Sequence, residues 1–474
     1  MKYPYPEPVF RYFAELSDIP RGSGNTDGIR TWCLKTAEKL GINAHTDNAG
    51  NVIIRKDASA GYEQHTPVIL QGHLDMVCAK LPDCKTDMIA EPPHLIWEKD
   101  AVHADGTTLG GDDGIAIAYC LALLEQNTLP HPPLTVILTN DEETGMDGAA
   151  GISPDELTGE MLINLDSEEE GVLTVGCAGG VRVHMSIPYE AAPASGTTVR
   201  LTLRGLTGGH SGTEINRPLL NANTALANIL ASVNIPLRIG TFQGGIRDNA
   251  IPTDCSVLLF CQQDDAAKLI CRAETEALKL KAEYPEETGL LLCPESGQGE
   301  QAAVLTDEST AKFIQFLNSL PNGVQEMNTL LNMPETSLNI GVVSLCGGTA
   351  DFDTLIRSGT NAKKDALADL LCEKTALAGG TSTQSGCYPA WEYLPDSRLE
   401  QTAKHVFRRL YGKDITVETI HAGLECGILS SKKPGLQCVS IGPDLFDVHT
   451  PRERLSIPSA ARTWEYLTAL LAEI

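Results

Sequence analysis

The residues best suited to chemistry are acidic and imidazole side chains placed beside short apolar segments. Five of them follow a predicted strand or open a predicted helix: His73, Asp112, Glu143, Asp166 and His449. In α/β folds, ligands bind beyond the carboxyl ends of the strands, so we expect these five side chains to converge. Imidazole and carboxylate groups bind zinc, cobalt and manganese. One bridging carboxylate is enough for two ions, because two-metal hydrolytic sites hold their ions roughly 3.5–4 Å apart.

Carboxylates next to the predicted ligands are placed to orient a ligand or to accept a proton. Asp75 follows His73 by two residues and is placed to accept a hydrogen bond from the imidazole nitrogen that does not bind metal. Glu142 and Glu143 are consecutive, so in an extended segment they point to different sides. One of the two then binds metal and the other takes a proton from water, and the sequence alone leaves open which does which. Each motif taken alone reads as an ordinary turn or cap; their shared placement favours a joint site.

The segment beyond about residue 183 adds weaker candidates. His210 lies in Gly208-Gly209-His210-Ser211-Gly212, where the glycines predict a tight turn that presents the imidazole. A plain strand-to-helix loop is the alternative, and the glycine-rich segment 244–252 has the same ambiguity. Arg357 ends an apolar segment, and its guanidinium either binds a substrate carboxylate bidentately or forms a surface ion pair.

The elements that must position these residues fall into two groups. The first group combines helical spacing with short apolar segments typical of strands buried on both faces. Its helices are expected at 8–18, 27–40 and 114–125, and its strands at 52–54, 67–70, 134–138 and 161–165. Strands and helices in this order predict an α/β domain whose central sheet is mixed, largely parallel and flanked by helices.

From about residue 183 the pattern changes to alternating strands and amphipathic helices. Strands are expected at 197–203, 253–261, 336–345 and 352–358, and helices at 218–232, 264–282, 307–319 and 361–377. The first pattern then returns, with a helix at 397–411 and strands at 415–420 and 436–441. We therefore predict an α/β domain of residues 1–182 and 389–474 that is interrupted by an inserted α+β domain, residues 183–388.

Composition supports this division and excludes some classes of partner. A chain of 474 residues is too long for one ordinary core. The net charge of −26 repels phosphate backbones, so nucleic acids and anionic membranes are disfavoured as partners. No segment reaches the roughly 18 apolar residues of a membrane span, and the first residues lack the apolar part of a signal peptide. The 14 cysteines include no C-x-x-C pair, which favours reduced thiols and a cytoplasmic location.

The order of the motifs resembles a known group of enzymes. The segments are Gly72-His73-Leu74-Asp75-Met76-Val77, Gly110-Gly111-Asp112-Asp113-Gly114, Asp141-Glu142-Glu143-Thr144-Gly145, Asn164-Leu165-Asp166-Ser167 and Gly208-Gly209-His210-Ser211-Gly212. Together they resemble the co-catalytic zinc peptidases, which include aminoacylase, tripeptidase and glutamate carboxypeptidase. Segments 176–180, 336–343, 385–389 and 421–427 are similar to one branch, the cytosolic aminoacyl-histidine dipeptidases, also called Xaa-His or beta-alanyl-histidine dipeptidases.

This resemblance implies a role for each candidate residue. It implies two zinc ions per subunit, one held by His73 and Asp166 and the other by Glu143 and His449, with Asp112 bridging. It further implies that Asp75 orients His73 and that Glu142 is the general base. The inserted domain is expected to be a lid that forms a homodimer and carries His210 to the partner's active site. Asn249 and Arg357 are expected to bind the substrate.

The function implied is hydrolysis of small peptides. The expected reaction is cleavage of Xaa-His dipeptides, similar to carnosine, by a zinc-activated water, with cobalt or manganese as substitute metals. The alternatives are a broader peptidase or an N-acyl amino acid deacylase. A metal-stabilised binding protein without turnover is a third alternative, but such a protein has no use for an unligated carboxylate beside its ligands.

Overall fold

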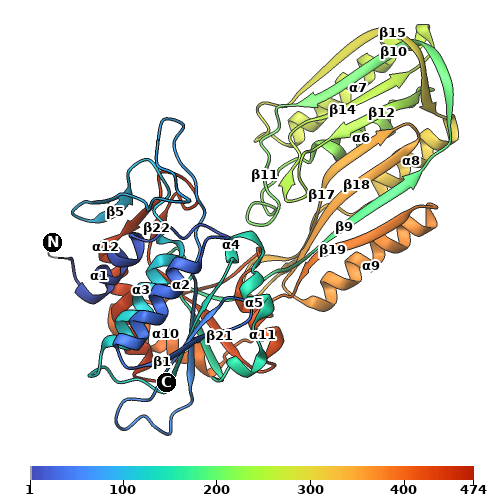
Figure 1. Cartoon of the computed structure of the whole chain (residues 1–474). Helices are drawn as coiled ribbons and strands as arrows, with labels where there is room; N and C mark the ends of the chain where they lie inside the picture. Colours follow the sequence, from blue (N-terminus) through green and yellow to red (C-terminus); the bar gives the residue numbers. More distant parts are fainter. Residues whose placement is uncertain (1–2) are drawn as a thin grey trace. The chain divides into compact units, whose positions relative to one another are not determined.

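The computed structural model describes residues 3–474, which form two compact units. Within the described residues, unit 1 comprises 3–176, Tyr393–Thr419 and Leu424–Ile474, and unit 2 comprises Cys177–Glu392 with Ile420–Gly423. Each unit has its own sheet and its own hydrophobic core (Figure 1). The roles predicted for the two parts of the chain, catalysis and a dimerising lid, stay predictions.

Unit 1 is built on an eight-stranded sheet in the order β1-β2-β6-β3-β7-β21-β8-β20. The strands are β1 (Asn43–Thr46), β2 (Val52–Lys56), β3 (Val68–His73), β6 (Leu134–Thr139), β7 (Met161–Asn164), β8 (Val172–Cys177), β20 (Thr416–Ile420) and β21 (Gln437–Ser440). Strand β3 pairs in parallel with β6 and β7, and β7 pairs in parallel with β21. Strands β1, β2 and β8 pair antiparallel with their neighbours. The predicted mixed sheet is therefore confirmed; its parallel pairings lie at the centre, and as many antiparallel pairings lie toward its edges.

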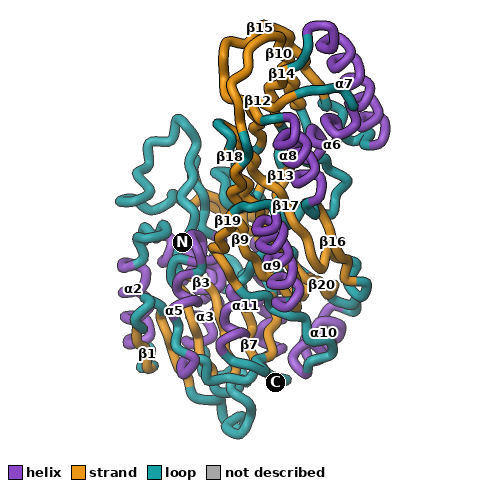
Figure 2. The backbone as a smooth tube through the Cα atoms, turned by 90° about the vertical axis from the view of Figure 1, so that its right-hand side faces the viewer, coloured by secondary structure: helices purple, strands orange, loops and turns teal. Residues whose placement is uncertain are grey.

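Helices cover this sheet and complete the core of unit 1 (Figures 1 and 2). They are α1 (Glu7–Ser17), α2 (Asp27–Lys39), α3 (Gly111–Glu125), α4 (Glu142–Gly145), α5 (Asp147–Gly151), α10 (Arg398–Tyr411), α11 (Glu425–Lys432) and α12 (Ile457–Leu471), with a 3-10 turn at Pro154–Glu156. Every residue of α3 from Gly111 to Leu124 is buried, which is typical of a helix inside a core. Helix α3 packs on α1 and β3, and this packing fixes the position of its first residues.

A second, four-stranded sheet in unit 1 joins two segments that carry predicted ligands. Its order is β22-β23-β5-β4, formed by Leu445–Phe446, Arg454–Ser456, Ala101–Ala104 and Leu95–Trp97. Strand β5 precedes the loop to Asp112, and β22 and β23 flank the loop with His449. The antiparallel pairing of β23 with β5 therefore holds these two loops side by side. The sequence analysis did not predict this sheet, because its strands have only two to four residues.

Unit 2 contains a nine-stranded antiparallel sheet. Eight strands follow the order β15-β10-β14-β12-β17-β18-β9-β19, and β16 pairs with β17. The strands are β9 (Gly179–Pro188), β10 (Ala191–Arg204), β12 (Arg238–Gly244), β14 (Cys255–Phe260), β15 (Leu291–Leu305), β16 (Gly323–Asn328), β17 (Met333–Cys346), β18 (Thr349–Ser358) and β19 (Thr381–Tyr388). The helices are α6 (Ala222–Val233), α7 (Gln263–Glu283), α8 (Asp307–Ser319) and α9 (Asn361–Leu377). This α+β composition agrees with the predicted class of the inserted segment.

Helix α6 begins four residues later than predicted. Asn221 caps it by accepting hydrogen bonds from the backbone N–H groups of Asn223 and Thr224, at 3.0 and 3.4 Å. A side-chain cap of this kind fixes the first turn, so the apolar residues before Asn221 belong to the preceding loop. A two-stranded ribbon, β11 (Gly209–His210) with β13 (Ala250–Ile251), replaces the simple turn expected around His210.

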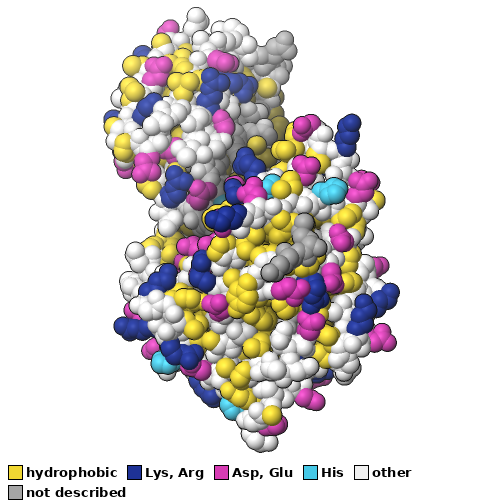
Figure 3. Space-filling model, turned by 90° about the vertical axis from the view of Figure 1, so that its left-hand side faces the viewer, with side chains coloured by type: hydrophobic (Ala, Val, Ile, Leu, Met, Phe, Trp, Pro, Cys, Tyr) yellow, Lys and Arg dark blue, Asp and Glu magenta, His cyan; other side chains and the backbone are white. Residues whose placement is uncertain are grey.

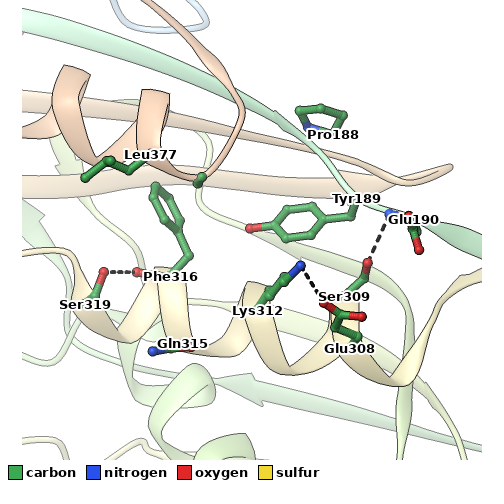
Figure 4. Close-up of a pocket in the computed structure, with 11 residues that line it drawn as sticks. Pro188, Tyr189, Glu190, Glu308, Ser309, Lys312, Gln315, Phe316, Ser319 and Leu377 are labelled. Carbon is green, nitrogen blue, oxygen red and sulfur yellow. Dashed lines mark hydrogen bonds and ion pairs between the residues drawn. The ribbon is translucent and has the colours of Figure 1, made fainter.

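A cavity of about 450 Å³ opens in unit 2 near helices α8 and α9 (Figure 4). Tyr189, Lys312, Phe316 and Leu377 line it. The ring of Tyr189 packs edge-on against Phe313, and its buried hydroxyl has no partner within the described part of the chain. Burial raises the pKa of Tyr189 well above its usual value, so this phenol stays protonated at neutral pH.

Charged side chains of both signs lie on the surface, and the helices vary in length and in apolar character. On the face shown in Figure 3, Asp and Glu side chains are interspersed with Lys and Arg. Among residues 3–474, none of the helices combines the length and the apolar character that crossing a bilayer requires.

Candidate metal centre

The five predicted ligands come together in unit 1. His73 is the last residue of β3, Asp166 follows β7 by two residues, and Asp112 lies in the first turn of α3. Glu143 lies in α4 directly after β6, and His449 lies in the loop between β22 and β23. Because β3, β6 and β7 are parallel, their carboxyl ends lie at one edge of the sheet. The four-stranded sheet brings the loops of Asp112 and His449 to the same place.

The distances within this group form a symmetric pattern around Asp112. Its Oδ1 lies 2.9 Å from His73 Nε2, and its Oδ2 lies 3.0 Å from His449 Nε2. The same nitrogen of His449 lies 3.0 Å from Glu143 Oε1, and His73 Nε2 lies 3.5 Å from Asp166 Oδ1. Each oxygen of one carboxylate therefore faces a different imidazole, and each imidazole also faces a second carboxylate.

Asp75 contacts His73 and the backbone N–H groups of Glu142 and Glu143. His73 Nδ1 lies 3.1 Å from the backbone oxygen of Asp75 and 3.5 Å from its carboxylate, so the main-chain oxygen is the nearer partner. The carboxylate accepts hydrogen bonds from Ser23 Oγ at 2.8 Å and from the backbone N–H groups of Glu142 and Glu143 at 3.0 and 3.3 Å. Burial opposes ionisation of Asp75, but the hydrogen bonds from His73 and Ser23 lower its pKa to about 2. Asp75 thus holds both His73 and the Glu142–Glu143 turn.

The two consecutive glutamates share one contact region but differ in one partner. Ligand atoms of Glu142, Glu143 and His73 all lie within 4.8 Å of one another, and Glu143 also contacts His449. Burial raises the pKa of Glu142 to about 9, and Asp166 adds to the effect. Asp141 and His449 next to these ligands have φ values of 52° and 62°, a conformation that costs a non-glycine residue on the order of 1–3 kcal/mol. The surrounding contacts must therefore hold both residues in place.

The residues present fit a pair of divalent cations. Three groups of three potential ligand atoms each lie within 4.8 Å: His73 with Asp113 and Asp166, His73 with Glu142 and Glu143, and Asp112 with Glu143 and His449. Burial raises the pKa of Asp166 to about 6, and the neighbouring carboxylates of Asp112 and Glu143 add to the effect. Carboxylates are in excess over cationic groups at this site. Divalent ions neutralise such an excess, and imidazole with carboxylate is a donor set that zinc accepts.

In the metal-free protein, the imidazoles of His73 and His449 carry the positive charge that metal ions would supply. Hydrogen bonds to Asp112 and Glu143 raise the pKa of His449 to about 11, so this imidazole is protonated at neutral pH in the metal-free protein. The pKa of His73 is also raised well above its usual value, because Asp166 and Asp112 outweigh burial. A metal-binding imidazole is neutral, so ions must displace these protons and bind more tightly as pH rises.

The predicted catalytic residue His210 and the two predicted substrate-binding residues, Asn249 and Arg357, lie in unit 2. His210 belongs to β11, and its neighbour Ser211 donates a backbone hydrogen bond to Asn249 O at 2.9 Å. Arg357 belongs to β18 and is buried; its Nη1 donates to the Tyr388 hydroxyl at 2.9 Å, and its Nη2 lies 3.5 Å from His210 Nε2. Arg357 Nε has no partner among residues 3–474. The partners of this buried cation are uncharged, which suits it to receive an anion.

Two further acidic residues in unit 1 were missing from the sequence-based candidates. Asp113 is buried and accepts the backbone N–H of His73 at 3.1 Å; burial raises its pKa well above the usual range. Glu425 is buried at the start of α11 and accepts from Gln71 Nε2 at 2.5 Å and Thr139 Oγ1 at 2.6 Å. The Asp-Asp pair was a usable signal for Asp113. Glu425 gave none, because it follows a loop rather than one of the central strands.

Comparison with known proteins identifies the group to which this site belongs. Residues 69–473 match peptidase family M20/M25/M40. The chain belongs to this family. The M20 chain is therefore a peptide-bond hydrolase, as predicted.

Individual relatives show which branch of the family this M20 peptidase resembles. It is 38% identical over 475 residues to the cytosol non-specific dipeptidase of Escherichia coli, covering 99% of this chain and 98% of that protein. It matches the crystal structure of aminoacylhistidine dipeptidase from Vibrio alginolyticus with a TM-score of 0.93 and 35% identity, covering 99% and 97% of the two chains. The predicted resemblance to this branch is confirmed. Aminopeptidase PepT from Bacillus cereus, with a TM-score of 0.56, 15% identity and 98% coverage of both chains, shares the fold.

Proposed function

We propose that this M20 peptidase is a cytoplasmic di-zinc dipeptidase that hydrolyses Xaa-His dipeptides. The observation that carries the metal part is the Asp112 carboxylate, whose two oxygens each face a different imidazole. The substrate part is supported by the names of the relatives from Vibrio alginolyticus and Escherichia coli, and the compartment by the latter. The second name, a non-specific dipeptidase, favours a broader range of dipeptides as the second candidate function.

The proposed ligand sets follow the contacts. His73 and Asp166 would hold one ion, Glu143 and His449 the other, and Asp112 both. When bound, the ions supply Lewis acidity toward the peptide carbonyl and lower the pKa of a water molecule. In this proposal residues 1–182 and 389–474 form the catalytic domain, and 183–388 form the lid.

The proposed reaction uses Glu142 to move one proton. Its raised pKa makes the carboxylate a strong base, and bound cations would keep it ionised. Glu142 takes the proton of the attacking water and then gives it to the amine that leaves. Asp75 holds the backbone of Glu142 and so fixes the base. In a binding protein without turnover, a strong base in this position would have no task.

His210 would contact the peptide carbonyl that is attacked, and Arg357 would bind the carboxylate end of the substrate. Burial and Arg357 lower the pKa of His210, so the imidazole is neutral at pH 7. The backbone N–H of Thr213 donates to His210 Nδ1 at 3.3 Å, and Arg357 Nη2, which can only donate, lies 3.5 Å from His210 Nε2. In the proposed reaction, a ring N–H of His210 would donate to the oxygen that becomes negative during attack, while Arg357 turns to the substrate. Arg357 would bind the carboxylate of the substrate, and Asn249 would assist.

A substrate panel tests this function. Protein treated with a chelator should be inactive, and zinc, cobalt or manganese should restore hydrolysis of Ala-His and beta-Ala-His. Gly-Gly measures the breadth of the dipeptidase activity, and an N-acetyl amino acid tests for a deacylase. Activity that survives complete metal removal would contradict the metal assignment. Hydrolysis of only the N-acetyl compound would replace the dipeptidase assignment.

The placement of His210 in the partner's site has its own test. Chains with Glu142→Gln and chains with His210→Ala should each be inactive alone. If His210 acts across a homodimer, mixing the chains creates one site that holds both changes and one site that holds neither, so activity returns. Native mass spectrometry must show that heterodimers have formed. Heterodimers without activity would show that His210 serves its own chain.

A further inference from the structure

The loop that carries Asp112 is held by the side chain of Glu453. Glu453 Oε2 accepts the backbone N–H groups of Leu109 and Gly110 at 2.8 and 3.0 Å. Its Oε1 accepts those of Gly111 and Asp112 at 2.7 and 3.3 Å. The side chain is 2% exposed, so one buried carboxylate satisfies four consecutive donors at the start of α3. Hydrogen bonds to an ionised acceptor are stronger than those between neutral groups.

The carbonyl groups around this loop are held by a buried cation, Arg21. Its Nη1 donates to the backbone oxygens of Leu74 and Asp75 at 3.0 and 2.7 Å, and its Nη2 donates to the oxygen of Gly110. Arg21 is also 2% exposed. One guanidinium thus joins the segment that follows His73 to the segment that precedes Asp112.

The glycines of the Gly-Gly-Asp-Asp-Gly segment leave space for these two side chains. A Cβ atom on Gly110 or on Gly114 would lie 2.6 Å from Arg21 Nη2. A Cβ atom on Gly111 would lie 3.1 Å from Glu453 Oε1. Gly110 also has a φ of 71°, which favours glycine. The segment is therefore packed closely against Arg21 and Glu453, and side chains larger than that of glycine would displace them.

Glu453 also connects the Asp112 loop to the loop of His449. It follows His449 by four residues, and its N–H donates to Thr450 O at 3.0 Å to close the turn between them. The next residue, Arg454, begins β23, which pairs with β5 before the Asp112 loop. Movement of Glu453 would therefore shift His449 relative to Asp112.

We propose that Glu453 and Arg21 are the positioning residues of the metal pair. Through backbone hydrogen bonds, they set the separation of His73, Asp112 and His449. The inference rests on the proposed function in that it takes these three residues as ligands. Groups behind metal ligands typically change metal affinity 10- to 100-fold when they are replaced.

The test is metal binding by Glu453→Gln. Glutamine keeps the shape, but its NH₂ group faces backbone N–H donors and two of the four hydrogen bonds are lost. We expect both ions to bind about 10- to 100-fold more weakly, measured by titrating zinc into metal-free protein against a chelator of known affinity. Because the ligand geometry changes, the visible absorption spectrum of the cobalt-loaded variant should also differ from that of the wild type.

A matched control is Glu400→Gln in the same unit. Glu400 is 1% exposed and accepts Asp396 N at 3.1 Å and the Tyr393 hydroxyl at 3.3 Å. Its replacement removes a buried carboxylate from backbone and side-chain donors without touching a ligand segment. We expect this variant to lose thermal stability but to keep the zinc affinity and cobalt spectrum of the wild type.

The outcomes separate positioning from simple stabilisation. If Glu453→Gln melts at a lower temperature yet binds zinc with wild-type affinity and gives the wild-type cobalt spectrum, the proposal is overturned. If Glu453→Gln does not fold, Glu453→Asp is measured in its place, and wild-type affinity in that variant overturns the proposal equally. If the wild-type protein binds no pair of ions, the proposed function is refuted. If wild type and variant bind the ions equally well, only the positioning proposal is refuted.

Discussion

Replacing Glu142 by glutamine should abolish most turnover while both metal equivalents remain bound. Glu142 lies beside the ligands, but Glu143 is the glutamate that contacts His449. Glutamine has nearly the same shape and cannot take a proton, so the change removes proton transfer without removing a metal ligand. General acid–base catalysis typically contributes 10²- to 10⁴-fold, and we expect a loss of about this size in kcat.

The neighbouring variant Glu143→Gln is the matched control for this prediction. It should lose one metal equivalent, because an amide binds a divalent ion less well than a carboxylate. Metal content by mass spectrometry and kcat are measured on the same samples. If Glu142→Gln lost an ion or kept its rate, the roles of the two glutamates would have to be exchanged or abandoned.

Replacing Asp112 by alanine should remove both ions and all measurable activity. The two oxygens of Asp112 face His73 and His449, so its loss takes one ligand from each predicted site. The hydrogen bonds from these imidazoles lower the pKa of Asp112 despite its burial, so it is ionised and ready to bind cations at neutral pH. We expect the zinc content of the variant to fall from two equivalents to none at a free zinc concentration that saturates the wild type.

The comparison variant is Asp166→Ala, which should lose only the ion shared with His73. Far-UV circular dichroism of both variants establishes that the fold is kept. Retention of one equivalent by Asp112→Ala would show that Asp112 is a terminal ligand and that another carboxylate bridges.

The strands that position the site could be predicted because they are buried on both faces. Strands β3 and β6 are buried at every position, and each contains three consecutive aliphatic residues, 68–70 and 136–138. Side chains at the ends of such strands share one edge of the sheet, so the convergence of His73, Glu143 and Asp166 followed from topology alone. Helix α3 was equally clear, because it is apolar on all sides.

Other parts of the fold and of the site left no such pattern. Strand β15 has exposed polar residues and glycines over much of its length, so its pairing with β10 is visible only in three dimensions. Glu453 acts on backbone atoms more than 340 positions away, as measured from Asp112. Arg21 likewise contacts main-chain oxygens rather than side chains. Contacts of this kind depend on the path of the backbone, and no local spacing of residue types predicts them.

The position of β21 in the sheet bears on the order in which the two units can be completed during synthesis. This strand lies between β7 and β8, and Ser440 hydrogen-bonds to Asn164, 276 positions earlier in the chain. Until residues 437–440 leave the ribosome, β7 has an unpaired edge and His449 is absent. The strands of unit 2 are contiguous from β9 to β19, so they are complete first. At that stage the strands of unit 2 would be complete while the sheet of unit 1 still has an unpaired edge, and unpaired strand edges favour aggregation.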